Sequence, residues 1–179
     1  MNKEFLPKHY EQFIIPPPPK SILCKEFLKL QYLGTNCSWK VRILKPPIAG
    51  WIVKENNKSI RIPTSNKKPD NCEGSFWAFY VWHYDIECLR ILYITEADVI
   101  DKIINLSKQE GDLTNYKIII TRYKYSNYHL MCWPIIEDSM PMENALKLHP
   151  VCLGMLYESK RQIYKNKDPW EVAKLSHLS

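Results

Sequence analysis

The chain has 179 residues and a formal net charge of +6, from 25 Lys and Arg against 19 Asp and Glu. This length suits one domain with extensions and can bury a core without disulfides or metals. No apolar run reaches the roughly 18 residues of a membrane-spanning helix, and the N-terminus lacks the apolar segment of a secretory signal. We therefore expect a soluble cytoplasmic protein that does not enter membranes. Its mild positive charge suits an anionic partner such as nucleic acid.

The six cysteines are spread singly along the chain, without a C-x-x-C pair or a histidine pair at zinc spacing. We therefore expect reduced thiols and neither a metal nor another cofactor. Cys88 and Cys132 fall in strand-like runs, where a free cysteine usually serves as a small buried apolar side chain.

Residues 1–37 are predicted to form an N-terminal arm. Pro16–Pro19 impose an extended polyproline II conformation that excludes helix and ladder pairing. Two interpretations remain open for this segment, a strap that lies on the domain and a docking motif for a partner protein. Lys25 to Tyr32 is a short apolar run that can pack against an edge of the core.

The first strands follow. Residues 39–45 alternate basic with apolar side chains, which is typical of a strand with one buried and one positively charged face. Pro46-Pro47 interrupts this pattern and residues 50–54 resume it, so we predict one long strand that bends at the prolines. Residues 59–63 form another basic and apolar alternation, and residues 64–75 form a polar loop with a basic cluster.

The central prediction is a hairpin. Residues 76–84 and 88–94 are rich in aromatic and β-branched side chains, and Asp85-Ile86-Glu87 separates them as a polar turn. Because side chains alternate along a strand, the residues from Trp77 to Tyr84 place large rings on both faces of the sheet. One face can fill a core. The other face is predicted to be covered by something flat and negatively charged.

Thr95 is predicted to cap a helix that ends near Gly111, and residues 116–123 and 128–134 are predicted strands.

Residues 136–179 are predicted to form a C-terminal helical extension. Candidate helices are residues 141–148 and 151–159. A further helix is predicted to start at Asp168-Pro169-Trp170-Glu171, where an N-cap, an N1 proline and an N3 acid stand in sequence.

The order of these elements predicts a mainly β fold with added helices. A bent strand, a hairpin of two strands, one helix and two final strands match a five-stranded OB-type barrel over residues 38–135. In that fold, nucleic acid lies over strands two and three, between the loop that joins strands one and two and the loop that joins strands four and five.

Several spaced motifs support this assignment: Val41-Arg42-Ile43-Leu44, Pro47-Ile48, Gly50-Trp51, Phe76-Trp77-Ala78-Phe79, Leu89-Arg90-Ile91-Leu92, Tyr116-Lys117-Ile118, Thr121-Arg122 and Pro134. With them the segment resembles the OB-fold single-stranded DNA-binding replication proteins of phages and mobile genetic elements. The resemblance implies a protein that coats unpaired DNA during replication or recombination, with replication proteins as possible partners. Two features depart from that family, a hairpin turn without glycine and a C-terminus without an acidic tail for recruiting partners.

Binding of a single strand requires rings that stack on bases and cations that contact phosphates. The candidate stacking rings are Trp51, Trp77, Trp82 and Tyr125, whereas Trp39 and Trp133 are assigned to the core. The candidate phosphate contacts are Lys40, Arg42, Lys54, Lys58, Arg61, Arg90, Arg122 and Lys124.

A nuclease and an adaptor are the alternative functions. Asp85 and Glu87 near His83 raise the question of a metal-dependent nuclease, but no second carboxylate cluster accompanies them, so no enzyme is predicted. An OB-fold adaptor that binds proteins in a replication or other nucleoprotein complex stays open, as does the choice between single-stranded DNA and RNA.

Overall fold

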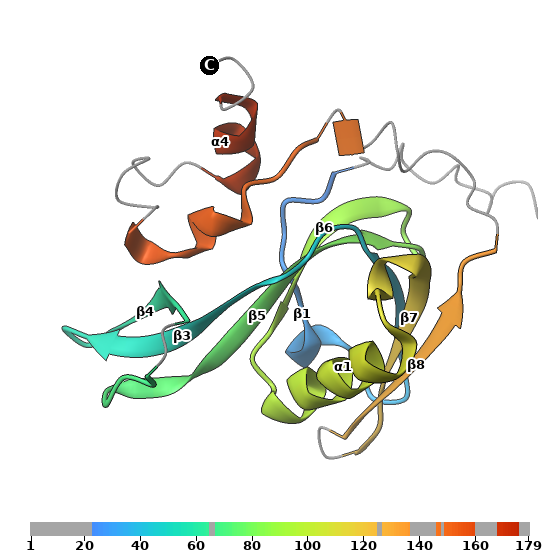
Figure 1. Ribbon diagram of the computed structural model, residues 1–179, viewed down its shortest axis with the longest axis horizontal. Coiled ribbons are helices and arrows are strands. Elements are labelled where there is room, and N and C mark those ends of the chain that lie inside the picture. Colours follow the sequence, from blue (N-terminus) through green and yellow to red (C-terminus); the bar gives the residue numbers. More distant parts are fainter. Residues whose placement is uncertain are drawn as a thin grey trace, which may run out of the picture.

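The computed structural model describes residues 23–64, 67–124, 127–136, 146–147, 149–159 and 168–175. The fold is mainly β, with one mixed sheet of eight strands (Figure 1). The strands are β1 (Leu28–Lys29), β2 (Ser38–Ile43), β3 (Ile48–Glu55), β4 (Lys58–Pro63), β5 (Cys72–His83), β6 (Cys88–Ile94), β7 (Tyr116–Arg122) and β8 (Tyr128–Pro134). The helices are α1 (Ala97–Glu110), α4 (Pro169–Leu175) and three short 3-10 turns, η3 (Leu30–Tyr32), η4 (Leu113–Asn115) and η6 (Leu153–Leu156).

The strands follow the order β1-β6-β5-β2-β7-β8, with β3 on the first half of β5 and β4 on β3. β1 runs parallel to β6, and the other pairs are antiparallel. The sheet curves around α1 (Figure 1). In the described part of the chain, β8 pairs with neither β6 nor β1, so the sheet stays open between its two ends.

The bent first strand is confirmed. β2 and β3 both pair with β5, and the register passes from Ile43 opposite Val81 to Ile48 opposite Ala78. Residues 44–47 therefore bulge against residues 79–80. The bulge falls at the two prolines because proline has no N–H to donate to the ladder.

The hairpin is also confirmed, with its turn one residue longer than predicted. β5 ends at His83, opposite Cys88, and the turn spans residues 84–87. Glu87 takes a left-handed conformation with φ of 51°. The carboxylate of Asp85 accepts a bond of 3.0 Å from the backbone N–H of Lys40, which ties the turn to β2.

One face of the hairpin fills an inner core, together with α1 and the inward residues of β2, β7 and β8. Phe79 and Val81 contribute from β5, and Leu28, Leu30 and Leu33 contribute from the segment before β2. The last three belong to the range that the sequence assigned to an N-terminal arm. The domain core therefore begins at about β1.

The other face of the hairpin is covered by the chain itself. We call residues 149–159 and 168–175 the cap. Cap side chains, including Trp170, pack on Phe76, Ala78, Tyr80 and Trp82 in an outer core. The hydroxyl of Tyr80 donates a bond of 2.6 Å to the carbonyl of His149, and burial raises the pKa of Tyr80 to about 12. The prediction of a flat, negatively charged partner on this face is therefore wrong, because apolar residues from later in the chain already cover it.

β3, β4 and the start of β5 form a three-stranded extension, the wing, which projects from the curved sheet at the left of Figure 1. Gly50 lies where the wing meets the outer core. A Cβ atom at this position would lie 2.3 Å from the carbonyl oxygen of Ile62 and 2.6 Å from the ring of Phe76. Only glycine fits here without displacing backbone.

The helix starts were predicted with mixed success. α1 ends before Gly111, as expected, but the residue at its N-cap is Glu96 and not Thr95. α4 has the predicted start, because Asp168 accepts bonds of 3.0 and 2.8 Å from the backbone N–H groups of Trp170 and Glu171. Residues 151–159 hold the short turn η6 where a longer helix was predicted. Pro16–Pro19 and most of residues 141–148 lie outside the described residues.

None of the described helices is long and apolar enough to cross a membrane. All six cysteines are free thiols, with Cys88 buried and Cys132 partly buried. Within the described residues, no three His, Cys, Asp or Glu side chains are grouped so that they could hold a metal ion.

Candidate nucleic-acid interface

Rings and cations meet in a groove between β1, β6 and the wing, which we call the wing groove. Its volume is about 370 Å³, and its lining includes Phe27, Lys29, Ser59, Arg61 and Tyr93. The guanidinium carbon of Arg61 lies 5.3 Å from the ring centre of Tyr93, and Phe27 stacks on the same ring at 6.1 Å. Burial raises the pKa of Tyr93, so its hydroxyl stays neutral. The groove therefore combines half-buried rings with two cations.

A second groove, the edge groove, lies on the other side of β1 and has a volume of about 700 Å³. Trp39 and Tyr32 line it, and the side chain of Tyr32 is 68% exposed. Arg90 lines it as well. Its Nε donates a bond of 3.3 Å to the carbonyl of Glu26, and its Nη2 lies 3.8 Å from the Glu26 carboxylate. Lys25 completes the positive lining, although it is paired at 2.6 Å with Asp168 of the cap.

The two grooves share Phe27 and Lys29. A single strand that crosses β1 could therefore contact rings and cations in both grooves. Rings that stack on bases and cations that contact phosphates are the two features that sequence-tolerant binding of unpaired nucleic acid requires. The β1 surface, defined as the two grooves together, is the best candidate interface among the described residues.

Arg61 and Arg90 were predicted to line one channel, and the register separates them. Arg90 pairs with Val81, whose side chain points into the inner core, whereas Arg61 pairs with Ile52, which packs on the outer core. Because side chains alternate along strands, the two guanidinium groups project from opposite faces of the sheet. Each guanidinium group lines its own groove, and the two grooves meet only at β1.

The other predicted cations are dispersed. Lys54 and Lys58 are exposed on the wing, and register places Lys54 on the same face as Arg61. Lys40 lies 3.7 Å from Asp85 on the outer side of β2, remote from β1 in the strand order. Lys124 is exposed beside the turn between β7 and β8.

Two predicted phosphate contacts hold backbone in place. Arg122 donates bonds of 3.2 and 2.8 Å to the carbonyls of Gln31 and Leu33, which anchors the segment after β1. Arg42 donates a bond of 2.9 Å to the carbonyl of Thr114. Charge-assisted bonds of this kind organise the fold whether or not a ligand is present.

The predicted stacking rings lie elsewhere. Trp82 is 6% exposed within the outer core, so it cannot stack on a base in the folded chain. Trp51 is half-buried on the wing and lines neither groove. Tyr125 lies outside the described residues. Trp133 was assigned to the core and is instead 59% exposed, whereas Trp39 packs on the inner core as expected while also lining the edge groove.

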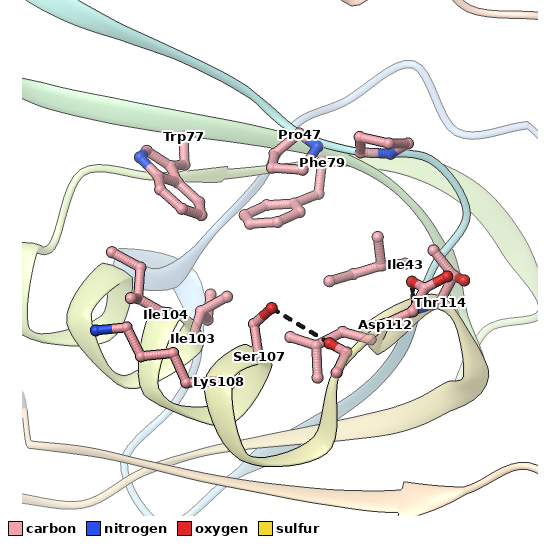
Figure 2. A pocket seen from close by; sticks show the side chains of 13 residues that line it. Ile43, Pro47, Trp77, Phe79, Ile103, Ile104, Ser107, Lys108, Asp112 and Thr114 are labelled. Atoms are coloured by element: carbon pink, nitrogen blue, oxygen red, sulfur yellow. Dashed lines mark hydrogen bonds between the residues drawn. The ribbon is translucent and has the colours of Figure 1, made fainter.

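Trp77 lines a third hollow, the helix pocket, which has a volume of about 380 Å³ between α1 and the β2–β5 side of the sheet. Figure 2 shows Trp77, Phe79 and Pro47 facing Ile103 and Ile104 across this pocket. The lining is mainly apolar, with Ser107, Lys108, Asp112 and Thr114 on the side of α1 and η4. Trp77 therefore belongs to a pocket at the end of the inner core and not to the β1 surface.

His83 is a buried titratable group beside the edge groove, 4% exposed and in edge-to-face contact with Trp39. Burial lowers its pKa, as does the charge of Arg90, while Asp85 at 3.4 Å acts in the opposite direction. The unfolded chain, with a histidine pKa near 6.5, therefore binds this proton more readily than the folded chain. Stability is present above that pH and is lost as the pH falls from about 6.5 toward the lower folded pKa.

We accordingly expect the urea midpoint to fall between pH 7.5 and pH 5.5, and to fall less in a His83→Phe variant. Urea unfolding followed by tryptophan fluorescence at several pH values measures this difference. His129→Gln provides the control, because it removes a histidine from an exposed position outside the core. Equal pH profiles for the parent chain and His83→Phe would show that this site does not govern the acid sensitivity.

Sequence reasoning missed the residues at the centre of the β1 surface. The sequence pattern leaves Phe27 and Lys29 in an ambiguous apolar run, and it does not single out Tyr32 or Tyr93 as binding residues. A signal was available, because residues 27 and 29 share a face if the run is a strand, and Tyr93 shares a face with Leu89 and Ile91 of β6. What the sequence could not supply is that β1 pairs with β6.

Comparison of the chain with protein-family models, curated proteins and solved structures finds no match in any of the three.

Proposed function

We propose that the protein binds single-stranded DNA, or RNA, across the β1 surface, without choosing sequence, and coats unpaired strands during replication or recombination. The observation that carries this proposal is the meeting of two grooves at Phe27 and Lys29, each lined by rings and cations. Phage and mobile-element replication proteins of the OB type are the class with which this function agrees best.

The strand order supports an OB-type barrel as part of this proposal. β2 pairs with β5 and β7, β5 pairs with β6, β7 pairs with β8, and α1 lies between β6 and β7 in the chain. These pairings agree with the five-stranded Greek-key order of an OB barrel. In our proposal, the closing position beside β6 is taken by β1 in place of the last strand, which brings Lys29 and Phe27 onto the binding surface.

Base stacking on an aromatic ring contributes about 1–3 kcal/mol per base, and contact with phosphates releases counterions from the strand. Tyr32 and Trp39 are the proposed stacking rings in the edge groove. Arg61 and Lys29 are the proposed phosphate contacts in the wing groove. Glu96 also lines the wing groove, so the net positive charge there is moderate. Because the cations contact phosphates, the affinity should nevertheless fall as the salt concentration rises.

The test is a titration of tryptophan fluorescence with oligo-dT at rising salt, since Trp39 lies in the interface. We expect the variant with both Arg61→Ala and Lys29→Ala to bind more weakly, with a salt slope that is smaller by about 0.7 for each phosphate that the variant no longer neutralises. Circular dichroism melts of both proteins establish that the variant still folds.

A matched control replaces two exposed lysines that line neither groove, with Lys45→Ala and Lys108→Ala in one chain. This control removes the same number of charges and should keep the parent slope. An unchanged slope in the groove variant, or the absence of any response to oligo-dT at micromolar protein, would refute the proposed interface.

A further inference from the structure

A second surface lies on the outward side of β2, β7 and β8, away from both β1 grooves. Three register rows cross these strands, and their alternate neighbours, such as Val41 and Ile118, point into the inner core. The side chains of the rows therefore point outward. We call this surface the β8 face, with the rows Ser38-Thr121-His129, Lys40-Ile119-Met131 and Arg42-Lys117-Trp133.

The β8 face exposes apolar groups that the fold does not cover with described residues. Trp133 is 59% exposed and Met131 is 40% exposed. Five large apolar side chains are exposed in the described part of the chain, and these are two of them. Clustered tryptophan and methionine side chains are enriched at protein–protein interfaces.

The charge of the face has one sign. Its nine positions include Lys40, Arg42 and Lys117 and no acidic residue. Lys117 lies next to Trp133 in its row, and its ammonium group sits 4.7 Å from the ring centre of Tyr84. Asp85 lies 3.7 Å from Lys40. A partner that complements this face therefore carries acidic groups around an apolar anchor.

We propose that the β8 face is a docking surface for an acidic segment of a partner protein, with an apolar side chain packed on Trp133 and Met131 and carboxylates beside Lys117. This inference is independent of nucleic-acid binding, since the face shares no residue with the wing groove and none with the edge groove.

Protein fits this face better than nucleic acid. Base stacking requires rings, and Met131, one of the two exposed apolar groups of the face, is not a ring. Ile119 in the middle row adds a branched aliphatic side chain. The β1 surface, in contrast, pairs its cations with the rings of Phe27, Tyr32, Trp39 and Tyr93. The two surfaces therefore differ in the chemistry they recognise.

The experiment measures fluorescence anisotropy of a short labelled peptide with alternating Asp and Leu residues and a central Phe. A second peptide carries Lys in place of Asp. The full chain should bind the acidic peptide and not the basic one. Trp133→Ala and Lys117→Glu should each weaken binding by about tenfold or more, as expected for an anchor and for a reversed charge at an interface. Melting curves establish that both variants fold.

The Tyr32→Ser variant and titration with oligo-dT distinguish the β8 face from the β1 surface. Tyr32→Ser should weaken oligo-dT binding and leave peptide binding unchanged, while Trp133→Ala should do the reverse. The docking proposal is overturned if both peptides bind equally, if neither binds, or if Trp133→Ala and Lys117→Glu leave the peptide affinity unchanged. It is also overturned if these variants weaken oligo-dT binding, which would make the face part of the strand path. Conversion of a dimeric parent to a monomer by Trp133→Ala would assign the face to a second copy of the chain and overturn it as well.

Discussion

Replacing Trp170 by alanine should destabilise the protein by about 3–5 kcal/mol, the usual range for removing a buried tryptophan or phenylalanine side chain. Trp170 is 2% exposed and packs into the outer core with Tyr80, Trp82 and Leu156. Alanine would leave a cavity that the surrounding β-sheet residues cannot collapse to fill. Urea unfolding at pH 7.5, monitored by circular dichroism, measures the loss.

Trp133→Ala is the matched control, because it removes the same side chain from a position that is 59% exposed. Its effect should stay within about 0.5 kcal/mol, as for most surface substitutions. If Trp170→Ala proved as harmless as Trp133→Ala, the cap would not be part of the core in solution. The face of β5 and β6 beneath it would then be available to a ligand.

Replacing Gly50 by alanine should destabilise the protein by about 3 kcal/mol, the upper part of the range for overpacking a core. The new methyl group would meet the carbonyl oxygen of Ile62 at 2.3 Å and the ring of Phe76 at 2.6 Å. Phe76 is fully buried between the wing and the cap, and Ile62 belongs to the neighbouring strand. Relief therefore requires β3 and β4 to move apart. A thermal melt would report the change as a lower Tm.

Gly74→Ala is the control for this position, since Gly74 lies on β5 of the same wing and a Cβ atom there meets nothing within 4 Å. Removing the conformational freedom of glycine in the unfolded chain should leave stability equal or slightly higher. Equal Tm values for the two variants would mean that the wing does not pack as closely as the distances at Gly50 require.

The cap changes where a ligand can bind. In OB folds, strands two and three carry the usual nucleic-acid surface. β5 and β6 are those strands in the proposed OB-type barrel, and their outer face lies under Trp170, Leu153 and Leu156. A ligand therefore cannot reach the middle of the hairpin, and the proposed interface lies at β1, where Phe27 and Tyr93 reach the edge of the covered area. Among the predicted contacts, Arg61 lines the wing groove at the edge of that covered area.

The local pattern of the sequence was enough to predict the hairpin, the bend between β2 and β3 and the start of α4. Alternation along residues 76–84 and 88–94 predicted the hairpin and its two apolar faces, because the side-chain period of a strand is read directly from the chain. The prolines at 46–47 predicted the bend between β2 and β3 for a similarly local reason. The capping box at Asp168 predicted the start of α4 within one residue.

Tertiary contacts decided which side chains face a ligand. Trp82 and Trp133 look alike in the sequence, each in an aromatic strand, yet one is buried under the cap and the other is exposed on β8. The difference depends on segments far apart in the chain, with the cap residues 149–159 and 168–175 over β5 and β1 against β6. The burial of a side chain depends on all the neighbours that meet at one place. The alternation of side chains along a strand depends on that strand alone and so cannot predict which of its faces is covered.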